Sequence, residues 1–281
     1  MSVIFPIGAA VLQAISFTLD KVVLSFKKIT YRTYVGISFP LMFIITLIIF
    51  FIFQPPLNFS LFSGKLLYLV IASVILTIIT NLIFYRALDE DKISEMEIIS
   101  LLGNIPLIIF TSFIFASERN YLIIFLALLA SCSVVWAHWK GHHFQIIKTT
   151  KLFLFWTLLI SPFGAIITKS LLAVWSPISL ELVRVGIVAL ILGPFFLRFE
   201  RKASVKAFLL LIATNILTTV AWILYFFSYQ KIGIIQTVLI FSLQPLLVYF
   251  ASIFFLKEKL HWKKFISFLI ILAAIVVARV V

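Results

Sequence analysis

Apolar residues are gathered into ten long runs, and polar residues are confined mostly to the short stretches between them. The runs are continuous and do not alternate with polar residues at every second position, which favours helices over transmembrane strands. Each run is close to the ~20 residues that a helix needs to cross a bilayer. The pattern therefore predicts an all-α polytopic membrane protein with ten transmembrane helices, at 3–24, 34–53, 66–87, 95–116, 121–139, 152–174, 178–197, 207–229, 233–256 and 262–280.

Composition supports a bilayer as the solvent of this chain. Its 281 residues are 63% hydrophobic, against about 45–50% in a typical soluble domain. The 12% of charged residues cannot cover the exterior of a soluble protein of this size. Since the connecting stretches are too short for a separate soluble domain, we expect the function to lie in or beside the membrane.

The positive charge predicts an orientation rather than a nucleic-acid partner. The net charge is +13, but the basic residues form short clusters between apolar runs and do not gather on one soluble face. Of the 23 lysines and arginines, sixteen lie in or beside the stretches after the odd-numbered runs and four beside those after the even-numbered runs. The positive-inside rule makes the first side cytoplasmic, so both termini are expected to face outward.

The two halves of the chain echo each other in five places, in the same order. The matches are offset by 139 to 150 residues, and they are VGI at 35–37 and 185–187, Lys21 and Lys169, Tyr85 and Tyr225, Pro106 and Pro245, and Glu118 and Glu258. This pattern predicts a duplication, with repeats at 1–147 and 148–281. A unit with five crossings must insert its copy upside down, which gives two inverted-topology five-helix repeats around a central cavity.

The halves resemble the EamA-like permeases of the drug/metabolite transporter (DMT) superfamily over the whole chain. The best motif is QPLLVYFASIFFLKE at 244–258, in which Glu258 follows Pro245 by thirteen residues. The first-half copy departs slightly, because Glu118 follows Pro106 by twelve. The resemblance implies a permease of a prokaryotic cell (inner) membrane, with a cavity lined by the first, third, fourth, sixth, eighth and ninth helices. Members commonly have cytoplasmic termini, whereas the charge count here predicts the reverse.

Polar side chains within the apolar runs are the candidates for substrate binding. Such groups are costly in hydrocarbon and usually face the bundle interior or a wet cavity. Contacts between helices and simple packing are the alternative interpretation. The candidates are Gln13, Asn81, Tyr85, Asn104, Trp222, Tyr225, Gln236 and Gln244.

Prolines and charges near the ends of the runs are the candidates for gating. Pro106 and Pro245 are expected to bend their helices and free a carbonyl, either as hinges or as static bends. Asp20 and Lys21 lie near the cytoplasmic end of the first run, where the aspartate can neutralise a lysine or take part in a gate, and where a lysine often only snorkels to the interface.

Two further carboxylate arrangements are expected to be structural. The i, i+3 spacing of Glu181 and Arg184 suits an ion pair. Glu118 and Glu258 are expected to close the turns between adjacent helices.

These features favour a secondary transporter of a small metabolite, such as an amino acid or a similar polar or amphipathic solute, working by alternating access. A multidrug or quaternary-cation exporter and a lipid-linked solute flippase remain alternatives, although no acid lies deep in a run. A membrane-embedded transferase is less favoured, because the acidic cluster at 89–97 has no partnered histidine. The chain lacks a nucleotide-binding loop, and we expect no enzyme activity, no cofactor, no metal and no partner beyond the solute and membrane lipid.

Overall fold

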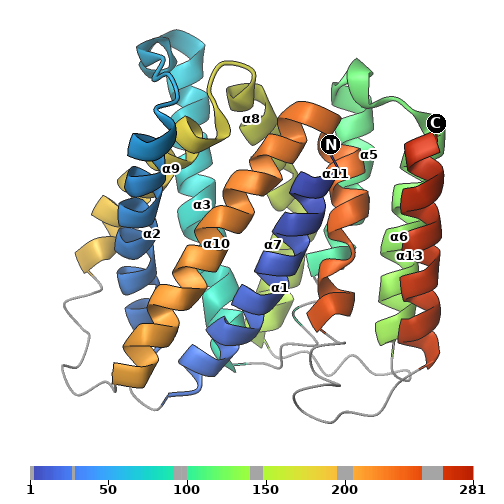
Figure 1. Ribbon diagram of the computed structural model, residues 1–281, viewed down its shortest axis with the longest axis horizontal. Helices are drawn as coiled ribbons and strands as arrows, with labels where there is room; N and C mark the ends of the chain where they lie inside the picture. The colour runs from blue at the N-terminus through green and yellow to red at the C-terminus, as the bar shows by residue number, and fades with distance from the viewer. Residues whose placement is uncertain are drawn as a thin grey trace.

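The computed structural model describes residues 3–26, 29–90, 96, 100–139, 148–194, 205–248 and 262–280. Throughout these ranges the regular structure is helical, which confirms the all-α prediction (Figure 1). Short 3₁₀ helices are at Phe59–Phe62 and Ala116–Glu118. The α-helices are α1 (Ile4–Leu24), α2 (Tyr31–Phe53), α3 (Gly64–Glu90), α5 (Asn104–Ile114), α6 (Tyr121–His138), α7 (Lys148–Leu159), α8 (Ser161–Leu172), α9 (Pro177–Leu192), α10 (Val205–Ile232), α11 (Ile234–Phe241) and α13 (Trp262–Val280).

Several helix starts are fixed by side-chain caps. The Thr30 hydroxyl accepts a hydrogen bond from the backbone of Thr33 at the start of α2, and the Ser176 hydroxyl accepts one from Ser179 at the start of α9. At the start of α6, the Asn120 carboxamide accepts two backbone N–H groups. These residues supply the acceptors that the first turn of a helix lacks, so each cap fixes where its helix begins after a short turn.

Length and hydropathy mark four of the described helices as candidate membrane spans, namely α1, α2, α3 and α10. Helices α7 and α8 make a fifth if they are taken as one span bent by 46°. The apolar helices at 100–114, 121–137 and 234–248 are shorter. Every one of the ten predicted runs contains at least one described helix, but the count of ten spans remains a prediction.

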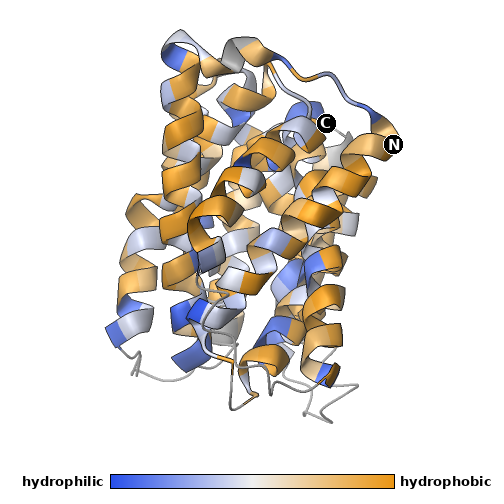
Figure 2. Ribbon diagram, turned by 90° about the vertical axis from the view of Figure 1, so that its left-hand side faces the viewer, coloured by the Kyte–Doolittle hydropathy of each residue, from blue (hydrophilic) through white to orange (hydrophobic). Residues whose placement is uncertain are grey.

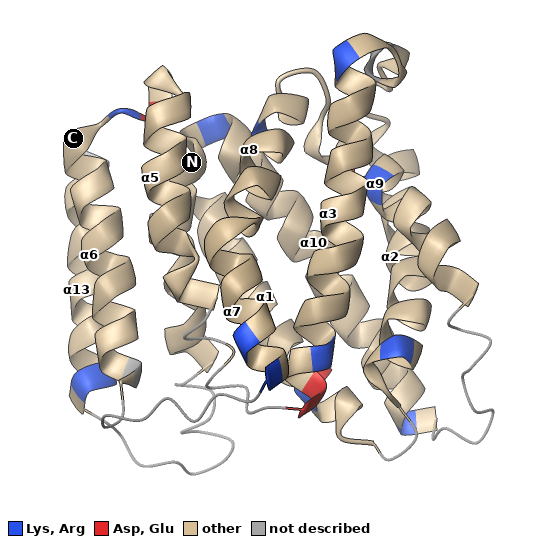
Figure 3. Cartoon of the chain, turned by 180° about the vertical axis from the view of Figure 1, so that it is seen from behind, with Lys and Arg blue, Asp and Glu red and all other residues tan. Residues whose placement is uncertain are grey.

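The helices stand side by side and are apolar over most of their length (Figures 1 and 2). Large apolar side chains on the outside are widely exposed, including Ile52 at 69% and Leu190 at 81%. Charged residues of the described chain lie mainly towards the two ends of the helices (Figure 3). This distribution is that of an integral membrane protein, in which the outer surface meets lipid.

The main helix pairs connect the first half of the chain with the second. Helix α1 packs against α10, α2 against α9, α3 against α7 and α8, and α6 against α13. If the ten runs are numbered in order, these are pairs 1–8, 2–7, 3–6 and 5–10. Exchanging the two halves turns this set of pairs into itself, as two repeats related by a two-fold axis would require.

Both chain termini lie at the same end of the bundle (Figure 1). We call this end the terminal face. The helix ends that adjoin the sixteen clustered lysines and arginines lie at the opposite end, which we call the basic face. The packed interior forms two apolar clusters, and the indole of Trp222 on α10 packs against both of them.

Candidate functional site

Asp20 is a buried acid at the interface of α1 and α10. Only 1% of its surface is exposed. Its Oδ1 accepts hydrogen bonds from the Tyr34 hydroxyl of α2 and the Thr214 hydroxyl of α10. Tyr34 is brought there because Thr30 starts α2 directly after α1 and places this ring in its first turn. Among the described residues, no lysine or arginine lies within ion-pair distance of Asp20.

A row of hydroxyl groups continues from Asp20 along the same interface. The Thr214 and Ser16 hydroxyl oxygens lie 2.8 Å apart, and the Ser16 hydroxyl in turn contacts that of Thr218. Ser16 and Asp20 are one turn apart on α1, as Thr214 and Thr218 are on α10, so two helix faces supply the row. The Ser-x-x-x-Asp and Thr-x-x-x-Thr spacings were visible in the sequence, yet we predicted only Asp20.

Lys21 does not neutralise its neighbour. Its ammonium group donates to the backbone carbonyls of Leu88 at 2.6 Å and Asp89 at 3.4 Å, at the end of α3. Consecutive residues on a helix point about 100° apart, so Lys21 cannot share the direction of Asp20. The structure therefore does not pair Asp20 with this lysine, and the gating role of the two residues remains a prediction.

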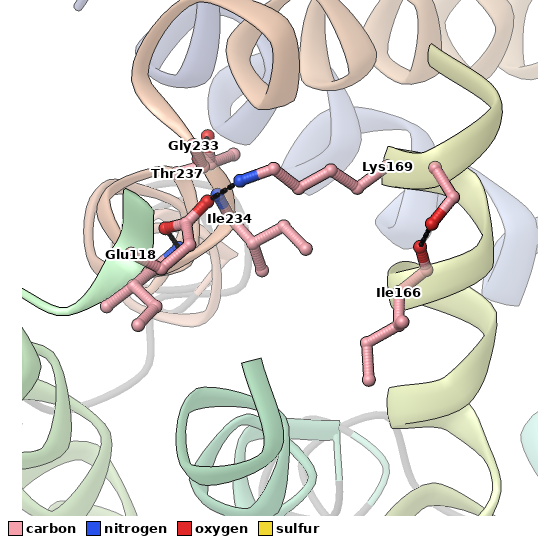
Figure 4. A network of polar contacts seen from close by, with 8 residues as sticks. Glu118, Ile166, Lys169, Gly233, Ile234 and Thr237 are labelled. Carbon is pink, nitrogen blue, oxygen red and sulfur yellow. Dashed lines mark hydrogen bonds and ion pairs between the residues drawn. The ribbon is translucent and has the colours of Figure 1, made fainter. Parts of the chain in front are cut away.

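A second polar cluster ties three helices together near the terminal face (Figure 4). The buried carboxylate of Glu118 accepts the backbone N–H groups of Ile234 at 2.8 Å and Ile235 at 3.2 Å, at the start of α11. It also forms an ion pair with Lys169 of α8. A carboxylate stabilises a helix N-terminus because the first N–H groups have no partner within the helix.

Gly233 is required for this approach. Its φ is +84°, in a region that favours glycine, and a Cβ on it would lie 2.5 Å from Oε1 of Glu118. We predicted that Glu118 closes the turn between adjacent helices. The side chain instead reaches a helix 116 residues away in the sequence, while the turn itself is made by backbone hydrogen bonds such as Asn120 N–H to Glu118 O. Glu258 lies outside the described residues.

Glu181 and Arg184 of α9 form the ion pair that their spacing predicted. The Glu181 side chain is fully buried and that of Arg184 is 12% exposed. The guanidinium also lies 4.6 Å from the centre of the Phe226 ring on α10. The contact of Arg184 with Phe226 therefore joins α9 to α10, and the opposite charges of the pair cancel.

An aromatic wall lies along α10 and faces α11. The ring of Tyr225 contacts those of Trp222 at 5.5 Å, Tyr229 at 4.7 Å and Phe241 at 4.7 Å between centroids. The Tyr229 hydroxyl donates to the Tyr225 hydroxyl at 3.0 Å. Two of the predicted substrate residues, Trp222 and Tyr225, are thus brought together, and sequence reasoning left Phe241 out.

Tyr85 belongs to the other cluster. Its ring packs on that of Tyr34, with 4.6 Å between centroids, beside Asp20. The predicted amides are half-buried, and Asn81 donates to the Thr77 carbonyl of its own helix. Within the described part of the chain, no hydrogen bond joins these amides to one another or to the aromatic wall. The half-buried amides are Gln13, Asn81, Asn104, Gln236 and Gln244.

Both prolines lie just after a short turn within an apolar helix, in the helices at 100–114 and 234–248. The first turn is at Gly103, whose φ of −64° and ψ of −22° remain helical, and Pro106 is the third residue of α5. The second turn is at Ser242 and Leu243, and Pro245 is the second residue of the helical stretch that follows. Proline is tolerated in the first turn because its missing N–H has no partner there anyway. Each of these turns begins three residues before its proline, so the arrangement occurs twice.

The second half of the chain matches a known family. Residues 149–280 match the EamA-like transporter family. The comparison with curated proteins returned no match.

The whole chain resembles solved structures. Among 27 similar solved chains, one described as "Crystal structure of protein" has 12% sequence identity and a TM-score of 0.76 over 99% of this chain and 97% of its own. At this identity the likeness concerns the fold, and it extends along the full length. Residues 149–280 therefore form an EamA-like transporter domain of the DMT superfamily, and the protein is a membrane transporter rather than an enzyme.

Proposed function

We propose that the protein is a secondary transporter that moves a small polar or amphipathic metabolite, such as an amino acid, by alternating access of two inverted five-helix repeats, 1–147 and 148–281. The observation that carries this proposal is the pairing of the helices. Every main pair joins one proposed repeat to the other, and the set is unchanged when the repeats are exchanged. Two such repeats can rock against each other about a central site and open it to one side at a time.

Polar ties at both ends of the bundle are suited to act as gates. Towards the basic face, Asp20 is held by Tyr34 and Thr214, and Lys21 by carbonyls at the end of α3. Near the terminal face, Glu118 holds α8 to α11. The contacts of Asp20 with Thr214 and of Glu118 with Lys169 and α11 link different proposed repeats, so a rocking motion that opens one end must break the contact there.

The solute site lies, in this proposal, between the aromatic wall and the half-buried amides. Trp222 and Tyr225 supply apolar surface with hydroxyl and indole donors, while the amides offer donors and acceptors without charge. Pro106 and Pro245 serve as hinges, since each follows a turn that weakens the helix near the middle of its run. A neutral or zwitterionic solute suits this lining better than an anion.

A quaternary-cation exporter is the second candidate, and the aromatic wall is the observation that favours it. Rings within about 6 Å of a cation attract it through their negative faces. The same wall can also hold the aliphatic part of a metabolite, so a ligand screen decides between the two.

The screen measures thermal stabilisation of the purified protein by amino acids, nucleosides, sugars, quaternary amines and lipid-linked sugars. Any stabilising compound is then tested for counterflow in proteoliposomes. We expect a small polar metabolite to stabilise the protein and Tyr225→Ala to abolish its counterflow. Tyr68→Ala is the matched control, because Tyr68 is 72% exposed on the lipid-facing side of α3. Equal transport by both variants would remove Tyr225 from the site, and stabilisation by quaternary amines alone would favour the exporter.

We also propose that the basic face is cytoplasmic and that both termini face outward. The charge asymmetry and the common position of the termini support this orientation. A C-terminal alkaline phosphatase fusion, active only outside the cytoplasm, is expected to be active, and a C-terminal fluorescent protein that folds only in the cytoplasm is expected to stay dark. The reverse pair of results would give the protein cytoplasmic termini.

A further inference from the structure

Asp20 differs from the other buried acids of the described chain in the groups that contact its carboxylate. Glu118 and Glu181 each face a basic side chain, Lys169 and Arg184 respectively. Asp20 is satisfied by hydroxyl groups within the described chain. A carboxylate that is shielded from water and lacks a fixed positive partner can be neutralised at low cost by one proton, whereas an ion-paired carboxylate cannot.

The hydroxyl row gives this acid a connection to the interior of the bundle. It runs from Asp20 through Thr214 and Ser16 to Thr218, with each oxygen in hydrogen-bond contact with the next. Thr218 is one helical turn from Trp222 on α10, and the Trp222 ring is part of the aromatic wall. The row therefore joins a buried acid near the basic face to the residues proposed to meet the solute.

We propose that Asp20 is the proton-binding carboxylate of a proton-coupled transport cycle, and that the hydroxyls of Thr214, Ser16 and Thr218 carry the proton between it and the solute site. This inference rests on the transport function proposed above. One proton binds to the Asp20 carboxylate and forms the carboxylic acid. In the relay each hydroxyl accepts a proton from one neighbour and passes its own to the next, so the hydroxyls are unchanged and one proton moves.

The groups around Asp20 suit a proton better than a metal cation. A cation needs several oxygens that turn their lone pairs towards one point, whereas the Tyr34 and Thr214 hydroxyls direct their hydrogens at the carboxylate. The other titratable groups nearby are Tyr85 on α3, whose ring packs on that of Tyr34, and Lys21, which is engaged by carbonyls of α3. Helix α10 presents Thr214 to Asp20.

The first test needs no substrate. The chain contains three aspartates, Asp20, Asp89 and Asp91. Protein labelled with ¹³C-aspartate is reconstituted in lipid and titrated with acid while its infrared spectrum is recorded. We expect an isotope-shifted C=O band of a buried protonated carboxyl group that is absent in Asp20→Asn and present in Asp89→Asn, the matched control.

Two results would overturn the proposal, one from this titration and one from a thermal-stability measurement. One is a labelled wild-type protein with no such band, or with a band that does not change with pH. The other is thermal stabilisation by Na⁺ at constant pH that Asp20→Asn abolishes, since it would make the site a cation site. If Asp20→Asn does not fold, the wild-type protein and Asp89→Asn still test the proposal, because the absence of a pH-dependent band from either would overturn it.

The second test uses the solute found by the ligand screen. With one proton moved per neutral solute, a gradient of one pH unit supports about tenfold accumulation in proteoliposomes. We expect Asp20→Asn to lose the pH-driven part of this accumulation and Thr218→Val, which removes the relay hydroxyl at nearly the same volume, to slow it. Accumulation by Asp20→Asn that still follows the pH gradient would refute the coupling role.

The two proposals fail in different ways. If no compound is transported by the wild-type protein, the transport function fails, and the infrared titration still reports whether Asp20 binds a proton. If a solute is transported without response to the pH gradient and Asp20 does not titrate, the coupling inference fails while the transport function stands.

Discussion

The tie between Glu118, Lys169 and α11 makes a sharp prediction about stability. Replacing Glu118 with alanine removes a buried carboxylate that accepts two backbone N–H groups and pairs with Lys169. Hydrogen bonds to a charged group contribute about 1.5–3 kcal/mol each, and removing one partner of a buried ion pair costs about 3–5 kcal/mol. Since the lysine is 19% exposed and can partly turn to water, we expect Glu118→Ala to lower the free energy of unfolding by about 3 kcal/mol.

A double-mutant cycle isolates the ion pair. Lys169→Ala leaves the carboxylate with its two N–H donors, so we expect a smaller loss than for Glu118→Ala. In the double variant the second change should cost less than it does alone, with a coupling of about 1 kcal/mol or more. The free energy is measured by titrating the purified protein in mixed micelles with SDS.

Glu90→Ala provides the matched control for this cycle. Glu90 pairs with Arg86 of the same helix, and both side chains are about half exposed, at 44% and 52%. Exposed pairs contribute about 0–1 kcal/mol, so this change should have little effect. Strictly additive losses at Glu118 and Lys169, or a loss at Glu118 no larger than at Glu90, would refute the reasoning.

Two further predictions concern the same SDS titration. Gly233→Ala should destabilise the protein by more than about 1 kcal/mol, because φ is +84° and the new Cβ would lie 2.5 Å from Glu118 Oε1. Gly164→Ala is the control and should be tolerated, because the nearest atom to its new Cβ is 3.9 Å away. Similar effects of the two changes would contradict this reasoning. Arg184→Leu should lower the free energy of unfolding by about 3–5 kcal/mol, because it leaves Glu181 buried without its partner. Adding Glu181→Leu should recover part of this loss. A double variant that is less stable than Arg184→Leu would contradict the pairing.

The helices were predictable because each apolar run is long and continuous, and a helix satisfies its own backbone hydrogen bonds in a membrane. The turns within runs were harder to predict, because Gly103 and Ser242 are different residue types. In each case only the proline three residues later indicates the turn. The Glu181–Arg184 pair was predictable because it is local, with both partners one turn apart on α9. The hydrophobic pattern and the residue spacing therefore predict the local structure.

The partners of Asp20 and Glu118 were not predictable in the same way. The N–H groups that bind Glu118 are on a helix 116 residues away, and any residue there supplies the same backbone donors. Thr214 is 194 residues from Asp20, and threonine is common in membrane helices, where it often bonds its own backbone. Only the packing of α1 on α10 decides that these hydroxyls meet the acid.

The two ends of the bundle therefore respond to different perturbations. Near the terminal face, Glu118 and Lys169 have opposite charges, and separating them requires water to solvate both. Towards the basic face, Asp20 is held by neutral hydroxyls, so one proton removes its charge and leaves the hydrogen-bonding groups in place. If the proposed repeats rock as a unit, opening the terminal face should depend on ionic strength, and opening the basic face should depend on pH. With this division, the proton gradient can act on the gate at the basic face by neutralising Asp20. Two ion-paired gates would offer no buried carboxylate that a proton can neutralise at low cost, so the gradient could not drive the opening of either end.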